Sequence, residues 1–222
     1  MLLTVENLQK SYVTGANSVP VLHDVNFTME KGDTLALEGE SGSGKSTVLH
    51  LIAGLDRSSG GRIMLEGADV THLADHAAAA LRRDRIGLVF QQFNLIPSLT
   101  VAANIAFHAR MADRYDADWT WHLTERLGLN TELQKYPEAL SGGQQQRVAI
   151  ARTLAARPVL VMADEPTGNL DEGTADTVLH LMLETAAELG SAVLMVTHSI
   201  RQAARMQRRL RLSHGVVRET ES

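Results

Sequence analysis

The chain has 222 residues, of which 44% are hydrophobic and 21% charged, a size and composition that suit one folded domain and exclude a disordered or fibrous chain. The net charge of −5 argues against strong nucleic-acid binding, and the absence of cysteine excludes disulfides and thiol catalysis. No apolar run approaches the roughly 18 residues of a membrane span and no secretory signal opens the chain, so a cytoplasmic protein is expected.

The first third of the chain predicts a β-layer followed by a strand, a loop and a helix. The runs LLTVENL and VLHDVNFTM alternate in polarity and are separated by GANSVP, which predicts antiparallel strands joined by a loop over residues 15–20. TLALEG is then a short buried strand, and it passes through a glycine-rich loop into the helical segment STVLHLIAGL.

The middle of the chain predicts helices. From DHAAAALRR to MADRYDADWTWHLTERLGL the pattern is helical and alanine-rich, interrupted by the strand IGLVF and the loop QQFNLIPSLT. Beyond it, the helix VAIARTLAARP ends at Pro158, VLVMAD is a buried strand, the next helix is capped by Gly190, and AVLMVTH is a last buried strand.

These elements predict an α/β fold with a parallel sheet, an N-terminal antiparallel β-layer and an inserted helical subdomain, because repeated β-α-β crossovers require parallel strands. One domain is expected over residues 1–222. Within it, residues 1–90 and 158–222 are predicted to form the core with the β-layer, and residues from about 91 to 157 the helical subdomain.

The glycine-rich loop carries the strongest chemical signal. Residues 39–46, GESGSGKS, match the pattern G-x-x-x-x-G-K-[S/T] of a phosphate-binding loop between a strand and a helix. Glycines let backbone N–H groups converge on phosphate oxygens, Lys45 can reach the β- and γ-phosphates, and the hydroxyl of Ser46 suits Mg²⁺. The residues predicted to bind the nucleotide here are Gly39, Ser41, Gly42, Ser43, Gly44, Lys45, Ser46 and Thr47.

A second signal is a buried strand, residues 160–164, that ends in two carboxylates. Parallel sheets place ligands at the carboxyl ends of their strands, so Asp164 is predicted to enter the Mg²⁺ shell. Glu165 follows directly and can orient or deprotonate the attacking water. An Asp-Glu pair after a strand is ordinary by itself, and it is the phosphate-binding loop that gives it this meaning.

Between the two signals lies LSGGQ, residues 140–144, which runs into QQRVAIAR. By itself, Ser-Gly-Gly at a helix start predicts a cap or a second nest of N–H groups for an anion. With the two preceding motifs, these residues make the chain resemble the ATP-binding-cassette (ABC) ATPase family. The resemblance implies that Ser141, Gly142, Gly143 and Gln144 close over the γ-phosphate of ATP held by a second subunit. A homodimer with two shared sites is therefore expected.

The resemblance extends from Tyr12 to His198 and assigns further roles. Tyr12 matches the aromatic residue that stacks on adenine, and the ring rather than the hydroxyl is expected to matter. Gln91, with Gln92 as the alternative, matches the glutamine that contacts Mg²⁺ or the water and relays motion to a membrane subunit. Asp171, in GNLD, matches a segment that crosses the dimer interface, and His198 matches a histidine on the γ-phosphate.

The segments GESGSGKST, FQQFNLIPSLT and ADEPTGNLD resemble the branch that serves lipoprotein release and macrolide efflux. This implies an ATPase subunit at the cytoplasmic face of the inner membrane that powers a separate permease, with an envelope adaptor as a possible further partner and no nucleic acid. The alternatives are an amino-acid importer subunit and, less in keeping with one phosphate loop and one LSGGQ, a soluble ABC ATPase.

Three features depart from these patterns or resemble other sites. Glu38 ends a buried strand, so it is expected to be partly exposed or to have a cationic partner. Trp119 and Trp121 cannot share a helix face, and one is expected to pack inside while the other marks a surface. His72 and His76 have the spacing of a helical metal site but lack a third ligand, and a solvated helix is the preferred interpretation.

Overall fold

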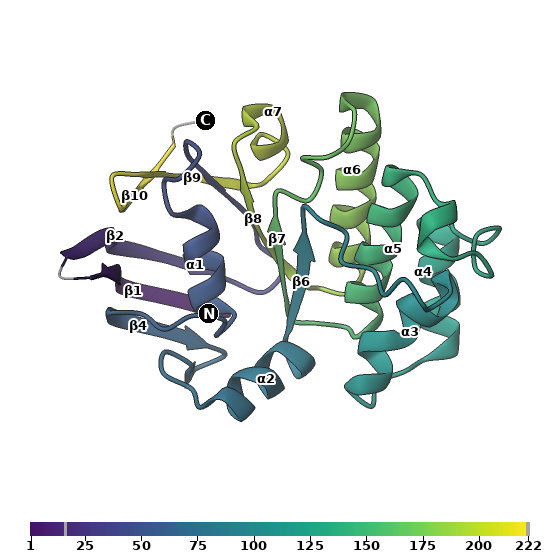
Figure 1. The fold of residues 1–222 in the computed structure, drawn as a ribbon, viewed down its shortest axis with the longest axis horizontal. Helices are drawn as coiled ribbons and strands as arrows, with labels where there is room; N and C mark the ends of the chain where they lie inside the picture. The colour runs from purple at the N-terminus through teal and green to yellow at the C-terminus, as the bar shows by residue number, and fades with distance from the viewer. Residues whose placement is uncertain (16, 221–222) are drawn as a thin grey trace. The chain divides into compact units, whose positions relative to one another are not determined.

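The computed structural model describes residues 1–15 and 17–220, which divide into two compact units (Figure 1). The first unit comprises Met1–Arg82 and Leu194–Ser222, and the second comprises Arg83–Val193. The chain passes from one unit to the other within α2 (Asp75–Asp84) and again within β8 (Ala192–Thr197). The boundaries of the helical subdomain predicted at residues 91 and 157 stay a prediction.

The first unit is built on a mixed sheet with the strand order β5-β4-β1-β2-β10-β9-β3. Its strands are β1 (Leu3–Thr14), β2 (Asn17–Met29), β3 (Thr34–Glu38), β4 (Gly60–Leu65), β5 (Ala68–Asp69), β9 (Arg208–Ser213) and β10 (Val216–Glu219). β1 pairs with β2 and β4 in antiparallel fashion, whereas β3 and β9 are parallel. The predicted antiparallel N-terminal layer is therefore confirmed.

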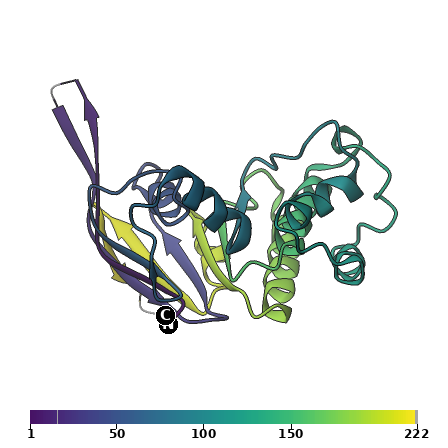
Figure 2. The same ribbon diagram turned by 90° about the horizontal axis from the view of Figure 1, so that it is seen from below.

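The hairpin of β1 and β2 is longer than the sequence pattern predicted (Figure 2). The loop expected over residues 15–20 is wrong for its second half, because β2 begins at Asn17; Ala16 lies outside the described residues. Pro20 is paired with Ser11, and the register of the two strands shifts between Lys10 and Ser11. Proline lacks an N–H to donate, so β2 tolerates it at this irregular point of the hydrogen-bond ladder.

Helix α1 (Lys45–Ile52) follows the glycine-rich loop directly, and its residues Val48, Leu49, Leu51 and Ile52 are buried. The apolar residues of α1 thereby join the core of the first unit, which also contains Leu35, Leu37 and Leu212. Because the helix is anchored on one side by this packing, its N-terminal turn and the loop before it are held at a defined place beside β3. The short helix α7 (Ile200–Ala203) completes this unit.

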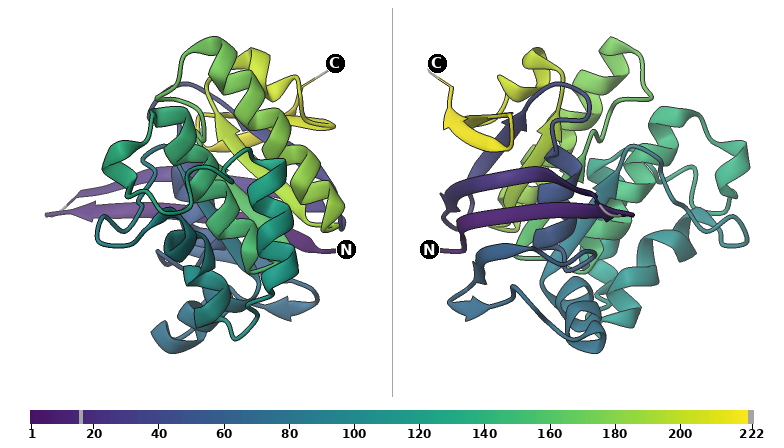
Figure 3. Two further views of the ribbon diagram at one scale, coloured as in Figure 1. Left: turned by 90° about the vertical axis from the view of Figure 1, so that its right-hand side faces the viewer. Right: turned by 60° about the vertical axis from the view of Figure 1, so that its left-hand side comes forward.

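The second unit combines two parallel strands with helices (Figure 3). Its elements are β6 (Ile86–Phe90), β7 (Leu160–Asp164), α3 (Val101–Met111), α4 (Ala117–Arg126), η1 (Pro137–Ala139), α5 (Gly142–Ala155) and α6 (Glu172–Glu188). The register pairs Phe90 with Asp164, so β6 and β7 end at the same edge. Helix α5 is buried over most of its length because it packs against α3, α4 and α6.

Two helix ends of the second unit follow local rules. The helical stretch predicted through residue 129 is broken, because Asp113 has a φ of 54° and Asp116 caps a new helix, α4, by accepting from the N–H of Trp119. Gly190 has a φ of 66° just after α6, as its predicted capping role requires. Across residues 1–15 and 17–220, no helix combines the length and apolar character needed to cross a membrane.

Candidate functional site

The glycine-rich loop has a backbone that only glycine can supply at key points. A Cβ on Gly39 would lie 2.6 Å from the carbonyl oxygen of Leu212, a backbone atom that cannot move aside. Gly42 and Gly44 have φ angles of 78° and 102°, and Gly44 is the N-cap of α1. The loop therefore ends where the first N–H groups of α1 and its positive dipole end begin, which is the geometry that binds phosphate.

The side chain of Lys45 turns back over this loop. It is only 6% exposed, and its Nζ donates to the carbonyl oxygens of Gly39 and Glu40 at 2.9 and 2.8 Å. The hydroxyl of Ser43 is buried and has no hydrogen-bond partner among the described residues. A buried ammonium, an unpaired hydroxyl and a glycine cradle are the donor set that a polyphosphate needs, so the residues present fit a nucleoside triphosphate.

Glu38, which ends β3 just before the loop, has the cationic partner that its burial requires. Its carboxylate accepts two hydrogen bonds from the guanidinium of Arg209 in β9, at 2.6 and 3.2 Å. Of the two explanations expected from the sequence, the ion pair is the correct one, because Glu38 is only 9% exposed. The paired carboxylate in turn holds the pKa of Arg209 above its usual value.

Tyr12 lies on β1 with its side chain 41% exposed. The resemblance implied that only the ring matters, but the hydroxyl also makes a hydrogen bond. It donates to Asp56, a residue 44 positions away, at 2.9 Å. Neither Asp56 nor Lys10, which binds the same carboxylate, was identified from the sequence. Nothing in the spacing of these residues indicates that they meet, since the contact depends on how β1 lies beside the segment after α1.

Asp164 and Glu165 lie at the carboxyl end of β7, and both are half-buried. Glu165 has a φ of 45°, a left-handed conformation that is uncommon for a residue other than glycine. It is followed by Pro166, and its carbonyl oxygen accepts from the N–H of Gly168 at 3.0 Å, which closes a turn. Backbone strain of this kind persists where surrounding structure enforces it, and it often marks a functional side chain.

Gln91, the first residue after β6, forms a reciprocal pair with Asn169. Its Nε2 donates to the side-chain oxygen of Asn169 at 3.1 Å, while the Nδ2 of Asn169 donates to the carbonyl oxygen of Gln91 at 3.0 Å. A Cβ on Gly168 would lie 2.8 Å from Gln91 Nε2, so a side chain there would displace Gln91. Gln91 rather than Gln92 makes these contacts, and the sequence did not identify Asn169 as its partner.

Ser141 begins α5 with a complete capping box. Its hydroxyl accepts from the N–H of Gln144 at 3.3 Å, and the side chain of Gln144 accepts from the N–H of Ser141 at 2.9 Å. A Cβ on Gly143 would lie 2.6 Å from the side chain of Thr174. Asp171 similarly caps α6, and the hydrogen bonds from Thr174 hold the pKa of its carboxyl below the usual value.

Three side chains further along α5 bind the backbone of β6 and of the loop after Gln91. Thr153 donates to the carbonyl of Leu88, and Gln146 donates to that of Phe90. Arg152, only 5% exposed, donates to the carbonyl oxygens of Asn94 and Phe93 at 2.6 and 3.2 Å. The helix capped by Ser141 and the loop that begins with Gln91 are thus joined through partly buried hydrogen bonds.

The predicted site residues come from both units. Tyr12, the glycine-rich loop and the exposed His198 belong to the first, whereas Gln91, the residues 141–144, Asp164, Glu165 and Asp171 belong to the second. Within the second unit, the paired ends of β6 and β7 bring Gln91 beside Asp164 and Glu165.

The sequence profile described as ABC transporter matches residues 22–168, which is more than half of the chain. The chain belongs to this family. Among curated relatives, the lipoprotein-releasing system ATP-binding protein LolD of Alcanivorax borkumensis is 43% identical over 220 residues, covering 98% of this chain and 96% of that protein. LolD of Shewanella oneidensis is 42% identical over 226 residues. An uncharacterized ABC transporter ATP-binding protein, YbbA of Escherichia coli K12, is also 42% identical, over 98% of this chain.

Solved structures agree with this assignment. A dimeric ATP-binding cassette, MJ0796, in a post-hydrolysis state bound to ADP and Pi matches with a TM-score of 0.88 and 34% identity over 100% of both chains. The predicted α/β fold of a phosphate-loop NTPase with its β-layer and helices is therefore confirmed. This chain is an ATP-binding and ATP-hydrolysing subunit of an ABC transporter, in the branch that includes the LolD proteins.

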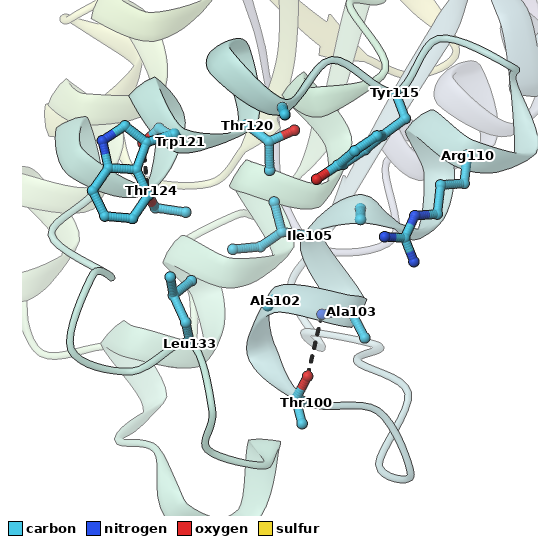
Figure 4. Close-up of a pocket in the computed structure, with 12 residues that line it drawn as sticks. Thr100, Ala102, Ala103, Ile105, Arg110, Tyr115, Thr120, Trp121, Thr124 and Leu133 are labelled. Atoms are coloured by element: carbon cyan, nitrogen blue, oxygen red, sulfur yellow. Dashed lines mark hydrogen bonds between the residues drawn. The ribbon is translucent and has the colours of Figure 1, made fainter.

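The second unit of this ABC subunit also carries a surface pocket of about 340 Å³ that contains none of the predicted nucleotide-binding residues (Figure 4). Its lining is mainly apolar, with Tyr115, Trp121 and Arg110 at its rim and Ala103 of α3 in its wall. As predicted, one of the two tryptophans marks the surface, since Trp121 is 52% exposed. Trp119 is half-buried rather than fully inside, and it donates its ring N–H to the carbonyl of Leu154 at 3.1 Å.

The histidine pair of the first unit does not form the helical arrangement considered for it. His72 lies in the turn before α2, which begins at Asp75, so the interpretation of His72 and His76 as neighbours on a solvated helix is wrong for His72. In the described part of the chain, no three His, Cys, Asp or Glu side chains cluster as a metal site.

Proposed function

We propose that this ABC subunit powers the release of lipoproteins from the inner membrane, working at the cytoplasmic face on a separate membrane-spanning permease. The observation that carries the proposal is the 43% identity to a LolD protein over nearly the full length of both chains. ATP hydrolysis is the shared activity of the family, and the cargo is read by the permease rather than by this chain. An envelope adaptor is a further partner in keeping with this work.

For the chemistry, the loop residues Gly39 to Ser46 bind the phosphates through backbone N–H groups and Lys45. Ser46, Asp164 and Gln91 are the residues proposed to hold Mg²⁺, which when bound neutralises charge on the β- and γ-phosphates. The support is the fit of the donor set: a buried ammonium that already binds carbonyl oxygens, and carboxylate and amide oxygens at one edge of the second unit. Tyr12 is proposed to stack on the adenine.

Glu165 is proposed as the general base for the attacking water, with His198 assisting at the γ-phosphate. The left-handed backbone of Glu165, held between β7 and the turn to Gly168, supports this role, because strained residues of this kind cluster at active sites. Gln91, held by Asn169, is proposed to align the same water.

The active form is proposed to be a homodimer in which Ser141, Gly142, Gly143 and Gln144 of one subunit close on the γ-phosphate bound by the other, with Asp171 near the interface. The matching cassettes are described as dimeric, which supports this arrangement. The capping box of Ser141 supports it too, because it fixes the start of α5, where the N–H groups of Gly142 and Gly143 and the positive end of the helix dipole suit an anion.

The loop from Gln91 to Pro97 and the neighbouring pocket are proposed to meet the permease. Asn104, fully buried, holds this loop by hydrogen bonds to Ile96, Leu99 and Thr100. Motion imposed on the loop therefore reaches α3, and through Arg152 it reaches α5, so closure at ATP and movement of the permease are mechanically linked.

The test is to isolate the tagged Glu165→Gln variant with Mg-ATP from native membranes in mild detergent and to identify the co-purifying membrane protein. A lipoprotein-releasing permease is expected, and the reconstituted wild-type complex should transfer a radiolabelled lipoprotein to a soluble acceptor when ATP is added. Recovery of an amino-acid importer permease, or ATP-dependent transport of amino acids instead, would overturn the assigned cargo. Lys45→Ala is the matched inactive control.

A further inference from the structure

Tyr12 is held in place by two residues to which no role has yet been given. Lys10 precedes it by two positions on β1, and both side chains reach the same carboxylate, that of Asp56. The carboxylate of Asp56 bridges them: its Oδ1 accepts from Lys10 Nζ at 2.6 Å, and its Oδ2 accepts from the Tyr12 hydroxyl at 2.9 Å. The aromatic ring is therefore fixed at its polar end.

The bridge is a strong one. Lys10 is only 7% exposed and also donates to the carbonyl oxygen of Arg57 at 2.7 Å, so its position is well determined. Burial alone would raise the pKa of Asp56, but hydrogen bonds from Lys10, the N–H of Arg57 and Tyr12 outweigh it and lower the pKa. The carboxylate is thus ionised at neutral pH, and charge-assisted hydrogen bonds of this kind are shorter and stronger than neutral ones.

The ammonium of Lys10 also lies over the ring of Tyr12, 4.6 Å from its centroid. A cation at this distance is attracted to the face of an aromatic ring, so Lys10 occupies one face of Tyr12. The side chain is nevertheless 41% exposed. A planar base that stacks on Tyr12 must therefore use the opposite face, with the ring plane already set by the hydroxyl's bond to Asp56.

We infer that Lys10 and Asp56 are positioning residues for the nucleotide base: they present one face of the Tyr12 ring, in a fixed plane, to the adenine. The inference rests on the stacking role proposed for Tyr12. Its physical basis is preorganisation, since a ring that is already ordered does not have to lose rotational freedom when the base binds. We expect loss of this support to weaken ATP binding about three- to tenfold.

The inference is tested by comparing two probes, Mg-ATP and Mg-tripolyphosphate, because only the first carries a base. Dissociation constants are measured by calorimetry for the full chain and for Asp56→Ala, Asp56→Asn, Tyr12→Phe and Tyr12→Ala. Asp56→Ala and Tyr12→Phe should each weaken ATP about three- to tenfold, their combination should add little, and Asp56→Asn should restore part of the affinity. Tripolyphosphate should bind all variants like the wild type.

The matched control is Asp69→Asn, which alters another carboxylate of the same unit that accepts from a hydroxyl and a backbone N–H, those of Thr71. It should leave both dissociation constants unchanged. If circular dichroism shows that Asp56→Ala is unfolded, the inference is decided by the two dissociation constants of Tyr12→Phe, a variant that lacks only the hydroxyl oxygen.

The outcomes separate this inference from the proposal on which it rests. If Tyr12→Ala weakens ATP binding but Asp56→Ala and Tyr12→Phe do not, Lys10 and Asp56 have no positioning role while the stacking role stands. If Tyr12→Ala leaves ATP affinity unchanged, the stacking role itself is wrong. An equal loss of ATP and tripolyphosphate affinity in Asp56→Ala would show that the residue supports the fold of the phosphate loop rather than the base, which also overturns the inference.

Discussion

The glycine-rich loop of the first unit and the residues around α5 in the second are positioned in contrasting ways. In the loop, Lys45 binds the carbonyls of Gly39 and Glu40, residues 6 and 5 positions away. Around α5, Arg152 binds Asn94 across 58 positions, and Gln91 binds Asn169 across 78. Lys45 of the loop proposed to bind phosphate is therefore held by local contacts, whereas the region proposed to respond to the γ-phosphate depends on long-range contacts.

Mutations in the two units should therefore have different effects on nucleotide binding and turnover. A local loop keeps its shape as long as its own residues and the helix after it remain, so variants in the second unit should spare nucleotide binding. Conversely, displacement of the loop is expected to reach α5, because Arg152 and Gln146 join α5 to the strand and loop on either side of Gln91. Variants there should change turnover more than affinity.

The largest effect is expected for Lys45→Ala. Removing the ammonium takes away the main counter-charge to the phosphates, so ATP affinity and hydrolysis should both collapse, with the rate falling at least about 10²- to 10³-fold. Steady-state phosphate release and nucleotide binding are the measurements. Lys31→Ala, at a side chain that is 71% exposed in the same unit, is the control and should behave like the wild type. Near-normal turnover of Lys45→Ala would contradict the assignment of the glycine-rich loop as the ATP-binding site.

Glu165→Gln should separate binding from chemistry. The amide cannot accept a proton from water, so the rate should fall on the order of 10²- to 10⁴-fold while ATP affinity is retained and a closed dimer accumulates. Asp164→Asn should instead weaken Mg²⁺-dependent binding as well as turnover. Rate, affinity and the dimer fraction by light scattering are measured for both variants, and wild-type turnover of Glu165→Gln would remove it as the general base.

Arg152→Met directly tests the long-range contacts between α5 and the loop after Gln91. Two partly buried hydrogen bonds from a charged donor would be lost, and the free energy of unfolding should fall by about 1–3 kcal/mol. Because the loop after Gln91 would also shift, kcat should fall about tenfold with ATP affinity unchanged. Arg147→Met is the matched control, since Arg147 binds the carbonyl of Leu127 instead and should lose stability without the same loss of kcat. Equal kcat losses in the two variants would contradict the role of the loop contact.

The smallest effect concerns pH. Burial, helped by the charge of Arg152, lowers the pKa of His108 to about 4. Between this value and its ordinary pKa near 6.5, the unfolded chain binds a proton that the folded chain does not, so stability is lost as the pH falls through that range. From pH 7 to 5 the loss should be about 1–2 kcal/mol. Urea unfolding at both pH values should show it in the wild type and in the control His76→Gln, but not in His108→Gln.

Much of the fold and of the candidate site could be predicted from the sequence. The loop GESGSGKS, the strand that ends in Asp164 and Glu165, the helix cap at Ser141 and the helix end at Gly190 all depend on residues within a few positions of one another. Their backbone conformations follow from glycine's freedom, from caps and from period-two or helical patterns, and each was found where the pattern indicated.

What the pattern missed depends on partners far apart in the chain. The hairpin of β1 and β2 runs through residues that resemble a loop, because pairing with β1 supplies hydrogen bonds that no local pattern reveals. His72 lies outside the helix expected to contain it, and α3 and α4 are separated by a left-handed residue at Asp113 that carries no glycine signal.

The sequence by itself determined the family, the phosphate-binding loop and many of the strands and helices, since these depend on short motifs whose backbone geometry is local. Only the tertiary structure decided which side chains support the motifs: Arg209 for Glu38, Asp56 and Lys10 for Tyr12, Asn169 for Gln91, and Arg152 for the loop after Gln91. The physical reason is that a charged or amide side chain takes whichever donor or acceptor the fold brings within about 3 Å, and spacing along the chain does not encode that neighbour.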